Sequence, residues 1–127
     1  MIEVRLGKTA LTVRGHAGFS RYGSDIVCAA ASMLAFALAE AVQAAEMKTP
    51  PVIEMERGQF RLEAPAAKEE RARTEGMFET VRAGYRLLAA RYPEYVRVLG
   101  WKSSENSMRK PEDRPPDGQK EEGNEGF

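Results

Sequence analysis

The 127-residue sequence contains a single cysteine and a single histidine. One cysteine cannot form an intramolecular disulfide, and a structural zinc site takes four Cys or His ligands, so we expect no metal and no cofactor. A thiol-based redox sensor would also lack a resolving cysteine. The fold must therefore rest on a hydrophobic core alone, and a reducing, cytoplasmic location is predicted.

A surplus of charge of one sign is absent as well, because 19 Lys and Arg residues balance 19 Asp and Glu residues. No global field attracts nucleic acid or an anionic membrane, and we expect neither as a partner. The longest uncharged run, residues 26–39, is shorter than the roughly 20 apolar residues that span a bilayer. The first residues also lack the basic start and continuous apolar stretch of a signal peptide. The uncharged run is therefore interpreted as a buried helix of a soluble domain.

Alternation of apolar and polar side chains predicts two pairs of strands. Residues 2–6 and 10–15 form the first pair, and residues 52–57 and 59–64 form the second pair around Gly58. With one apolar face on each strand, both pairs are expected to be hairpins that pack on a core.

Two helices are predicted after these hairpins. Ser24 or Asp25 can cap the first, which continues through residues 26–47 in a segment rich in Ala, Leu, Met and Glu. Residues 67–92 carry an apolar stripe with spacings of three and four, which is typical of a surface helix that covers a sheet. The residues of this stripe are Met77, Val81, Tyr85, Leu88 and Tyr92. Residues 95–101 could add a short last strand.

This order predicts an α+β fold, in which a mixed β-sheet and two helices form a two-layer sandwich over residues 1–99. Residues 100–127 are charged, contain three prolines and have almost no aliphatic side chains, which predicts a disordered C-terminal tail. The first helix is apolar nearly all round, so a sheet alone would leave one apolar side exposed. We expect a homodimer in which a second copy of this helix covers that side; the alternative is coverage by the second helix of the same chain.

The single histidine and the single cysteine are candidates for a catalytic pair. His16 ends the second strand, and Cys28 lies in the first turn of the first helix, where unpaired amides and the helix dipole predict a lowered thiol pKa. A nearby imidazole that accepts the thiol proton would generate a nucleophilic thiolate. The same residues also fit an inert core thiol and a histidine in a turn, so both interpretations stay open.

Asp25 and Ser32 lie close to this cysteine in the sequence, and each has more than one possible role. Asp25 can cap the helix or orient the imidazole as the third member of a triad. An unpaired carboxylate so near the sulfur would raise the thiol pKa, so we expect Asp25 to be bonded to backbone amides or to His16. Ser32, one turn beyond Cys28, lines the same pocket, donates a hydrogen bond to the sulfur, or bonds its own helix backbone.

The segment "GHAGFSRYGSDIVCAAAS", residues 15–32, resembles the signature of the ribosomal-processing cysteine protease family called Prp. That signature is Gly-His-Ala, a short variable loop, and then Gly-x-Asp-Ile-Val-Cys-Ala-x-x-Ser. The matching residues are Gly15, His16, Ala17, Gly23, Asp25, Ile26, Val27, Cys28, Ala29 and Ser32. The resemblance implies that Cys28 is the nucleophile and His16 the general base, with Asp25 and Ser32 at supporting positions.

The same resemblance implies a small homodimeric protein that removes an N-terminal extension from large-subunit ribosomal protein twenty-seven, its peptide substrate. Residues 17–24 would close over that substrate, with Gly18 and Gly23 as hinges. Amides at the start of the first helix would stabilise the oxyanion. The residues expected in the substrate loop are Gly15, Ala17, Gly18, Phe19, Tyr22 and Gly23. The alternative function is a noncatalytic ribosome-associated module that only holds a peptide in the same cleft.

Overall fold

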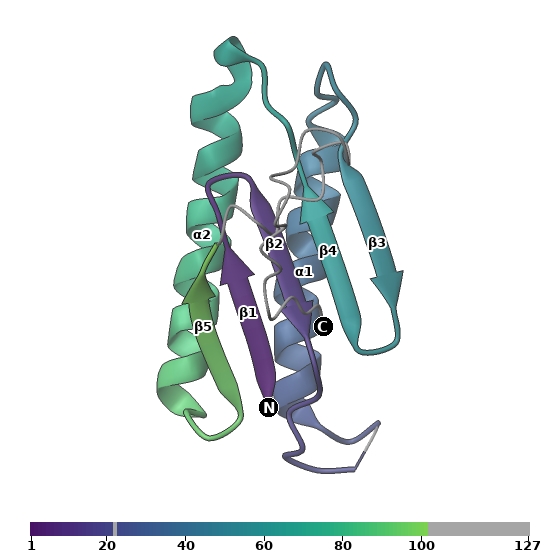
Figure 1. The fold of residues 1–127 in the computed structure, drawn as a ribbon, viewed down its shortest axis with the longest axis vertical. Helices are drawn as coiled ribbons and strands as arrows, with labels where there is room; N and C mark the ends of the chain where they lie inside the picture. The colour runs from purple at the N-terminus through teal and green to yellow at the C-terminus, as the bar shows by residue number, and fades with distance from the viewer. Residues whose placement is uncertain (22, 102–127) are drawn as a thin grey trace, which may run out of the picture.

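The computed structural model of the chain describes residues 1–21 and 23–101 and has the predicted two-layer α+β architecture (Figure 1). The predicted tail falls outside the described residues except at its start, where Gly100 ends the last strand, and Tyr22 of the predicted substrate loop is outside them too. In chain order the elements are β1 (Ile2–Leu6), β2 (Ala10–Arg14), α1 (Ile26–Ala44), β3 (Val52–Glu56), β4 (Gln59–Glu63), the short 3₁₀ helix η1 (Lys68–Glu70), α2 (Arg71–Arg91) and β5 (Val96–Gly100).

The five strands form one mixed sheet in the order β3-β4-β2-β1-β5. Both predicted hairpins are confirmed, because β1 pairs antiparallel with β2 and β3 pairs antiparallel with β4. The last strand is confirmed as well, and it joins the edge of the sheet parallel to β1. The hairpins meet through an antiparallel pairing of β2 with β4, in which Arg14 lies opposite Gln59.

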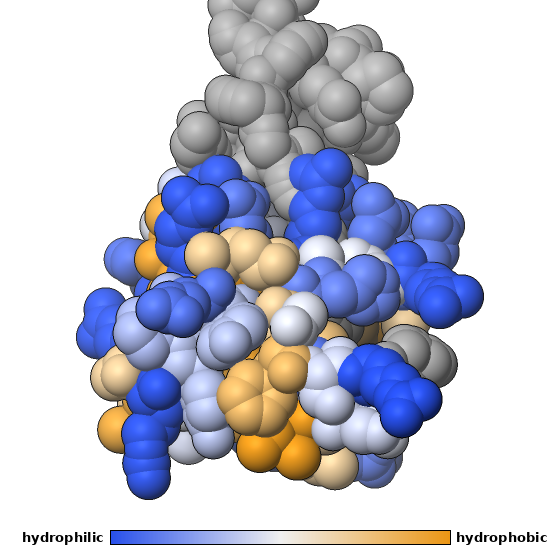
Figure 2. Space-filling model, turned by 90° about the horizontal axis from the view of Figure 1, so that it is seen from below, coloured by the Kyte–Doolittle hydropathy of each residue, from blue (hydrophilic) through white to orange (hydrophobic). Residues whose placement is uncertain are grey.

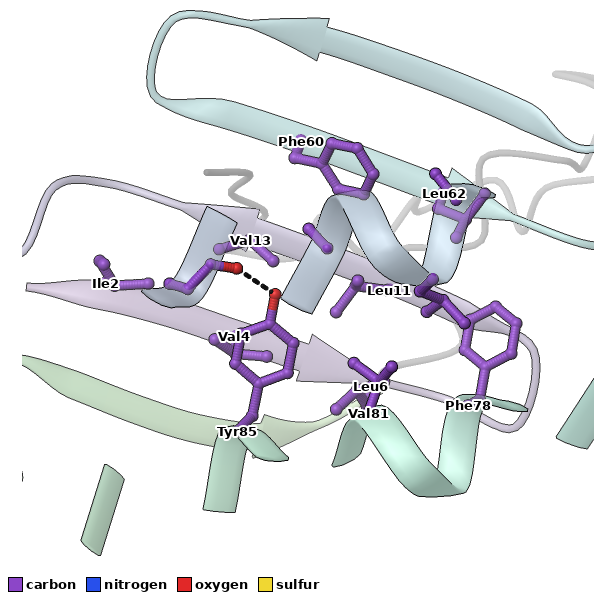
Figure 3. Packing of buried hydrophobic residues seen from close by; sticks show 14 of the residues in the cluster. Ile2, Val4, Leu6, Leu11, Val13, Phe60, Leu62, Phe78, Val81 and Tyr85 are labelled. Carbon is purple, nitrogen blue, oxygen red and sulfur yellow. Dashed lines mark hydrogen bonds between the residues drawn. The ribbon is translucent and has the colours of Figure 1, made fainter. Parts of the chain in front are cut away.

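Both helices lie on one face of the sheet (Figure 1), where they cover the apolar side chains of the strands. The helices contribute residues spaced by three or four positions, as an amphipathic face requires. The predicted stripe of α2 is confirmed at Val81 and Tyr85, but Thr74 and Phe78 are also buried there. The largest fully buried side chains, most of them drawn in Figure 3, are Tyr85, Phe60, Phe78, Ile2, Leu11, Leu38, Leu62, Val4, Val13, Val27, Val42 and Val96.

Tyr85 connects the two helices through a buried hydrogen bond. Its hydroxyl donates to the carbonyl oxygen of Ala31 in α1 at 2.8 Å (Figure 3). We expect Tyr85→Phe to lower the free energy of unfolding by about 1 kcal/mol, because it removes this bond without opening a cavity. Urea denaturation monitored by circular dichroism measures the change, and an unaltered midpoint would show that the bond contributes nothing.

Helix α1 is long and apolar enough to cross a membrane by length and composition alone, a test that core helices of soluble proteins also pass. In the structure it packs against β2 and α2. Large apolar side chains nevertheless stay exposed on it, including Ile26 at 58% and Met33 at 64% of their surface. Helix α2 therefore leaves part of the apolar surface of α1 uncovered.

Candidate active site

Three segments that are distant in sequence meet at the lower end of the sandwich in Figure 1: the connection after β2, the start of α1, and the turn between β3 and β4. Antiparallel pairing of β2 with β4 brings the end of β2 next to the β3–β4 turn. The Gly15 N–H donates to the Gly58 carbonyl oxygen at 3.0 Å and fixes this junction. The chain therefore leaves the sheet beside that turn and continues directly into His16.

Gly15 sits where no other residue fits. Its φ of +97° lies in the region that favours glycine, and a Cβ atom there would lie 2.4 Å from the carbonyl oxygen of Met1. Because the chain at Gly15 passes so close to the Met1 carbonyl oxygen, its path into His16 is fixed.

Asp25 organises the start of α1 and the preceding loop together. It is the N-cap residue, and its Oδ1 accepts the amides of Val27 and Cys28, both at 3.0 Å. Its Oδ2 accepts the amides of Phe19 at 2.9 Å and Ser20 at 3.2 Å. Burial acts to raise the pKa of this carboxyl, but the four amides together outweigh it and lower the pKa below its ordinary value. The predicted bonding of Asp25 to backbone amides is confirmed.

Cys28 is half-buried, and its Sγ accepts the Ala17 N–H at 3.3 Å. Burial raises the pKa of the Cys28 thiol, and the negative charge of Asp25 adds to this, while the Ala17 amide acts in the opposite direction. The predicted lowering of the thiol pKa is therefore wrong. The amides at the helix start that would stabilise a thiolate donate to Asp25 instead, so the thiol needs a base at neutral pH.

The same hydrogen bonds revise the expected oxyanion site. The helix-start amides of Val27 and Cys28 are occupied by Asp25, so they do not point freely at the cleft. Ala17 provides the backbone amide that faces the sulfur. The loop after β2 thus supplies a backbone amide next to the sulfur that an oxyanion could use, while the Val27 and Cys28 amides of α1 are bonded to Asp25.

His16 lies beside the thiol because it is bonded directly to Ala17, whose nitrogen contacts the sulfur. Its imidazole is exposed, so it can change rotamer without displacing core residues. Within residues 1–21 and 23–101, the structure gives no hydrogen bond between this imidazole and the thiol or the Asp25 carboxylate. Asp25 thus acts here as cap and loop acceptor, and not as a partner of the imidazole.

Cys28 and His16 both line an open cleft of about 560 Å³. Figure 2 views the molecule from this end and shows apolar side chains gathered between hydrophilic ones. The predicted site residues that line the cleft are Gly15, His16, Gly18, Gly23, Asp25, Cys28 and Ser32. Of the other predicted loop residues, Ala17 is buried, and Phe19 packs against Tyr92 and Tyr95.

Sequence reasoning missed other residues that line the cleft. Phe36 of α1 and Met55 of β3 line it, together with Glu56 and Arg57 at the β3–β4 turn. The hairpin around Gly58 was predictable, but the pairing of β4 with β2, which carries its turn to His16, joins segments far apart in the chain. In the part of the chain that the structure describes, no group of three or more His, Cys, Asp or Glu side chains could hold a metal ion.

A cysteine thiol at a helix start, in an open cleft that a histidine also lines, is the arrangement of a thiol hydrolase site. The sequence profile of the cysteine protease Prp family matches residues 1–97, so the chain belongs to this family of cysteine proteases. A comparison with curated protein sequences gives no significant match.

Solved structures share the fold. Two are of an essential ribosomal processing protease Prp from S. aureus, one with a covalently linked product peptide (TM-score 0.65, 22% identity) and one with a substrate peptide (TM-score 0.60, 21% identity). Each match covers 79% of this chain and 97% of the other. The structure of SMU.848 from Streptococcus mutans is 28% identical, with a TM-score of 0.60 over 79% of this chain and 93% of that chain.

Proposed function

We propose that the protein is a cysteine endopeptidase of the cytoplasm that removes the N-terminal extension of large-subunit ribosomal protein twenty-seven. The carrying observation is that Cys28 and His16 line one open cleft, with the Ala17 amide on the sulfur. Membership of a cysteine protease family supports the reaction class. The S. aureus protein of the same fold, described as a ribosomal processing protease and solved with peptides, supports a ribosomal peptide substrate.

The proposed reaction is acyl transfer to Cys28. The imidazole of His16 takes the thiol proton, and the thiolate attacks the scissile carbonyl carbon while the Ala17 N–H stabilises the oxyanion. The carbon–nitrogen bond then breaks, and the imidazolium gives its proton to the leaving amine. A water molecule, deprotonated by His16, hydrolyses the thioester and frees the thiol. Because burial keeps the thiol pKa high, the proton transfer to His16 is the step that makes the nucleophile.

The test is incubation of the extended ribosomal protein with the wild-type protein, Cys28→Ala and Thr80→Ala, followed by mass spectrometry of the products. Thr80 lies on the exposed face of α2 and serves as the remote control. We expect cleavage at one position by the wild type and Thr80→Ala, and none by Cys28→Ala. Binding without cleavage by the wild type would favour the peptide-binding module, and equal cleavage by Cys28→Ala would exclude a thiol nucleophile.

We also propose that two copies pair through α1. Its exposed apolar side chains, among them Ile26 and Met33, continue into a shallow groove between α1 and α2, at which Leu87 is 70% exposed. Apolar surface of this kind on two facing helices is typical of a subunit interface. A second copy would bury it symmetrically.

Met33→Glu tests this pairing, because it places a charge in the centre of the proposed interface. We expect the wild type to elute with twice the chain mass of 14.1 kDa in light-scattering chromatography, and Met33→Glu with the single mass. Gln59→Glu adds the same charge on the exposed side of β4 and should leave the mass unchanged. A monomeric wild type at micromolar concentration would contradict the proposal.

A further inference from the structure

Phe19 is not one of the residues that line the cleft, although its two neighbours are. Gly18 and Ser20 belong to the cleft wall, whereas the Phe19 ring lies against Tyr92 and Tyr95 at the junction of α2 and β5. The ring centroids are 5.6 Å and 5.3 Å apart with interplanar angles of 78° and 83°, which is the favourable edge-to-face geometry. The ring is 41% exposed, and its aromatic contacts are with these two tyrosines, so we look to the backbone of Phe19 for its effect on the cleft.

The backbone of this segment carries contacts that matter to the thiol. The Phe19 and Ser20 amides donate to the carboxylate of Asp25, and two residues earlier the Ala17 amide donates to the sulfur of Cys28. Gly18 between them has a φ of +73° and no atoms within 4 Å of where a Cβ would lie, so it does not fix the segment itself. Residues 17–20 are thus held by Asp25 on one side and by the Phe19 ring on the other.

The tyrosines that receive the ring are themselves fixed to the frame of the fold. The Tyr92 amide donates to the Leu88 carbonyl at the end of α2, and the Tyr95 amide donates to the Tyr92 carbonyl, both at 2.9 Å. The Tyr95 carbonyl accepts the Ile2 amide of β1 at 2.8 Å. Phe19 therefore ties the loop that follows β2 to a point where α2, β5 and β1 meet.

We propose that Phe19 is a positioning residue of the peptidase: its contact with Tyr92 and Tyr95 holds residues 17–20 so that the Ala17 amide stays on the Cys28 sulfur. This inference rests on the proposed roles of Cys28 and His16. Each edge-to-face pair changes a conformational equilibrium by a factor of about 2 to 12. Loss of both pairs is therefore expected to lower the population of the conformation in which the Ala17 amide contacts the sulfur about tenfold or more. No group that touches the substrate is lost.

Steady-state kinetics with the extended ribosomal protein as substrate tests whether the Phe19 contact affects catalysis. We expect Phe19→Ala to lower kcat about tenfold with KM changed less than twofold, and Phe19→Tyr, which keeps the ring, to stay within twofold of the wild type. Tyr95→Leu should reduce kcat in the same way, and the reduction in the double variant Phe19→Ala with Tyr95→Leu should be smaller than the product of the two single reductions. An unchanged kcat in Phe19→Ala, a change in KM alone, or fully multiplicative effects would overturn the inference.

Amide hydrogen exchange tests the same contact without any substrate. We expect the Ala17 amide to exchange about tenfold faster in Phe19→Ala than in the wild type or Phe19→Tyr, while Val13 in the core of β2 exchanges at an unchanged rate. Equal acceleration at both amides, or none at Ala17, would overturn the inference. A wild-type protein without peptidase activity would contradict the proposed function alone, because the exchange rates would still report on the Phe19 contact.

Discussion

Replacement of His16 by alanine will lower kcat/KM for the extended substrate about 10²- to 10⁴-fold at pH 7, the usual contribution of a general base. The structure makes the base necessary, because burial and the charge of Asp25 raise the pKa of the Cys28 thiol. The imidazole is exposed, so its removal leaves the core intact, and far-UV circular dichroism should be unchanged.

The pH dependence of this variant distinguishes a base from a substrate contact. Without the imidazole, activity requires thiol that has ionised on its own, and the thiolate fraction rises tenfold per pH unit below the thiol pKa. The deficit of His16→Ala relative to the wild type should therefore shrink as the pH rises from 7 towards 9. A deficit that is constant over this range would assign His16 to substrate binding, and a wild-type rate at pH 7 would remove it from the mechanism. His16→Gln, which keeps a polar side chain of similar length, should behave like alanine.

The elements of the fold could be predicted because each one leaves a local pattern. Alternation in residues 2–6 and 10–15 specifies strands with one buried face, and the structure has β1 and β2 there. The neighbours of each strand in the sheet leave no such pattern. Alternation assigns a side chain to a face but does not say that β2 pairs with β4, so the strand order had to come from the structure.

The candidate active site also contains residues that the sequence predicts and residues that it does not. His16, Asp25 and Cys28 could be identified because they are rare residues or occupy a motif that lies within one continuous segment. The wall formed by Met55 and Arg57 could not, because it reaches the cleft only through sheet pairing. The sign of the thiol pKa shift could not be predicted either, since it depends first on how far the fold buries the sulfur and then on the contacts of the sulfur with the Ala17 amide and the Asp25 charge.

Asp25 also raises the thiol pKa, and its replacement carries the largest expected effect on stability. Asp25→Ala removes the acceptor of four amides, two in α1 and two in the loop after β2. Loss of an N-cap costs about 1 kcal/mol, and the unpaired loop amides add a similar amount. We expect a loss of about 2–3 kcal/mol in the free energy of unfolding, measured by urea denaturation at pH 7, together with at least a 100-fold loss of kcat.

The pH dependence of stability assigns this effect to the carboxylate. Because the pKa of Asp25 is lowered in the folded protein from an ordinary value of 3.8, its contribution to stability is fully present above about pH 4. The contribution disappears as the pH falls through the lower pKa of the folded state. The difference in stability between the wild type and Asp25→Ala should therefore be constant from pH 7 to 5 and shrink below pH 4. An undiminished difference at pH 3 would mean that the ionised carboxylate is not what stabilises the fold.

Asp25→Asn distinguishes the hydrogen bonds that Asp25 accepts from α1 from those that it accepts from the loop after β2, since asparagine is as good an N-cap as aspartate. Its side-chain oxygen can still accept the Val27 and Cys28 amides, but its NH₂ group then faces the Phe19 and Ser20 amides, donor against donor. We expect Asp25→Asn to keep more of the stability than Asp25→Ala but to lose most of the kcat, because the loop that brings Ala17 to the sulfur is released. If Asp25→Asn were as active as the wild type, the helix cap alone would be the function of Asp25, and the hydrogen bonds to the loop would be irrelevant to catalysis.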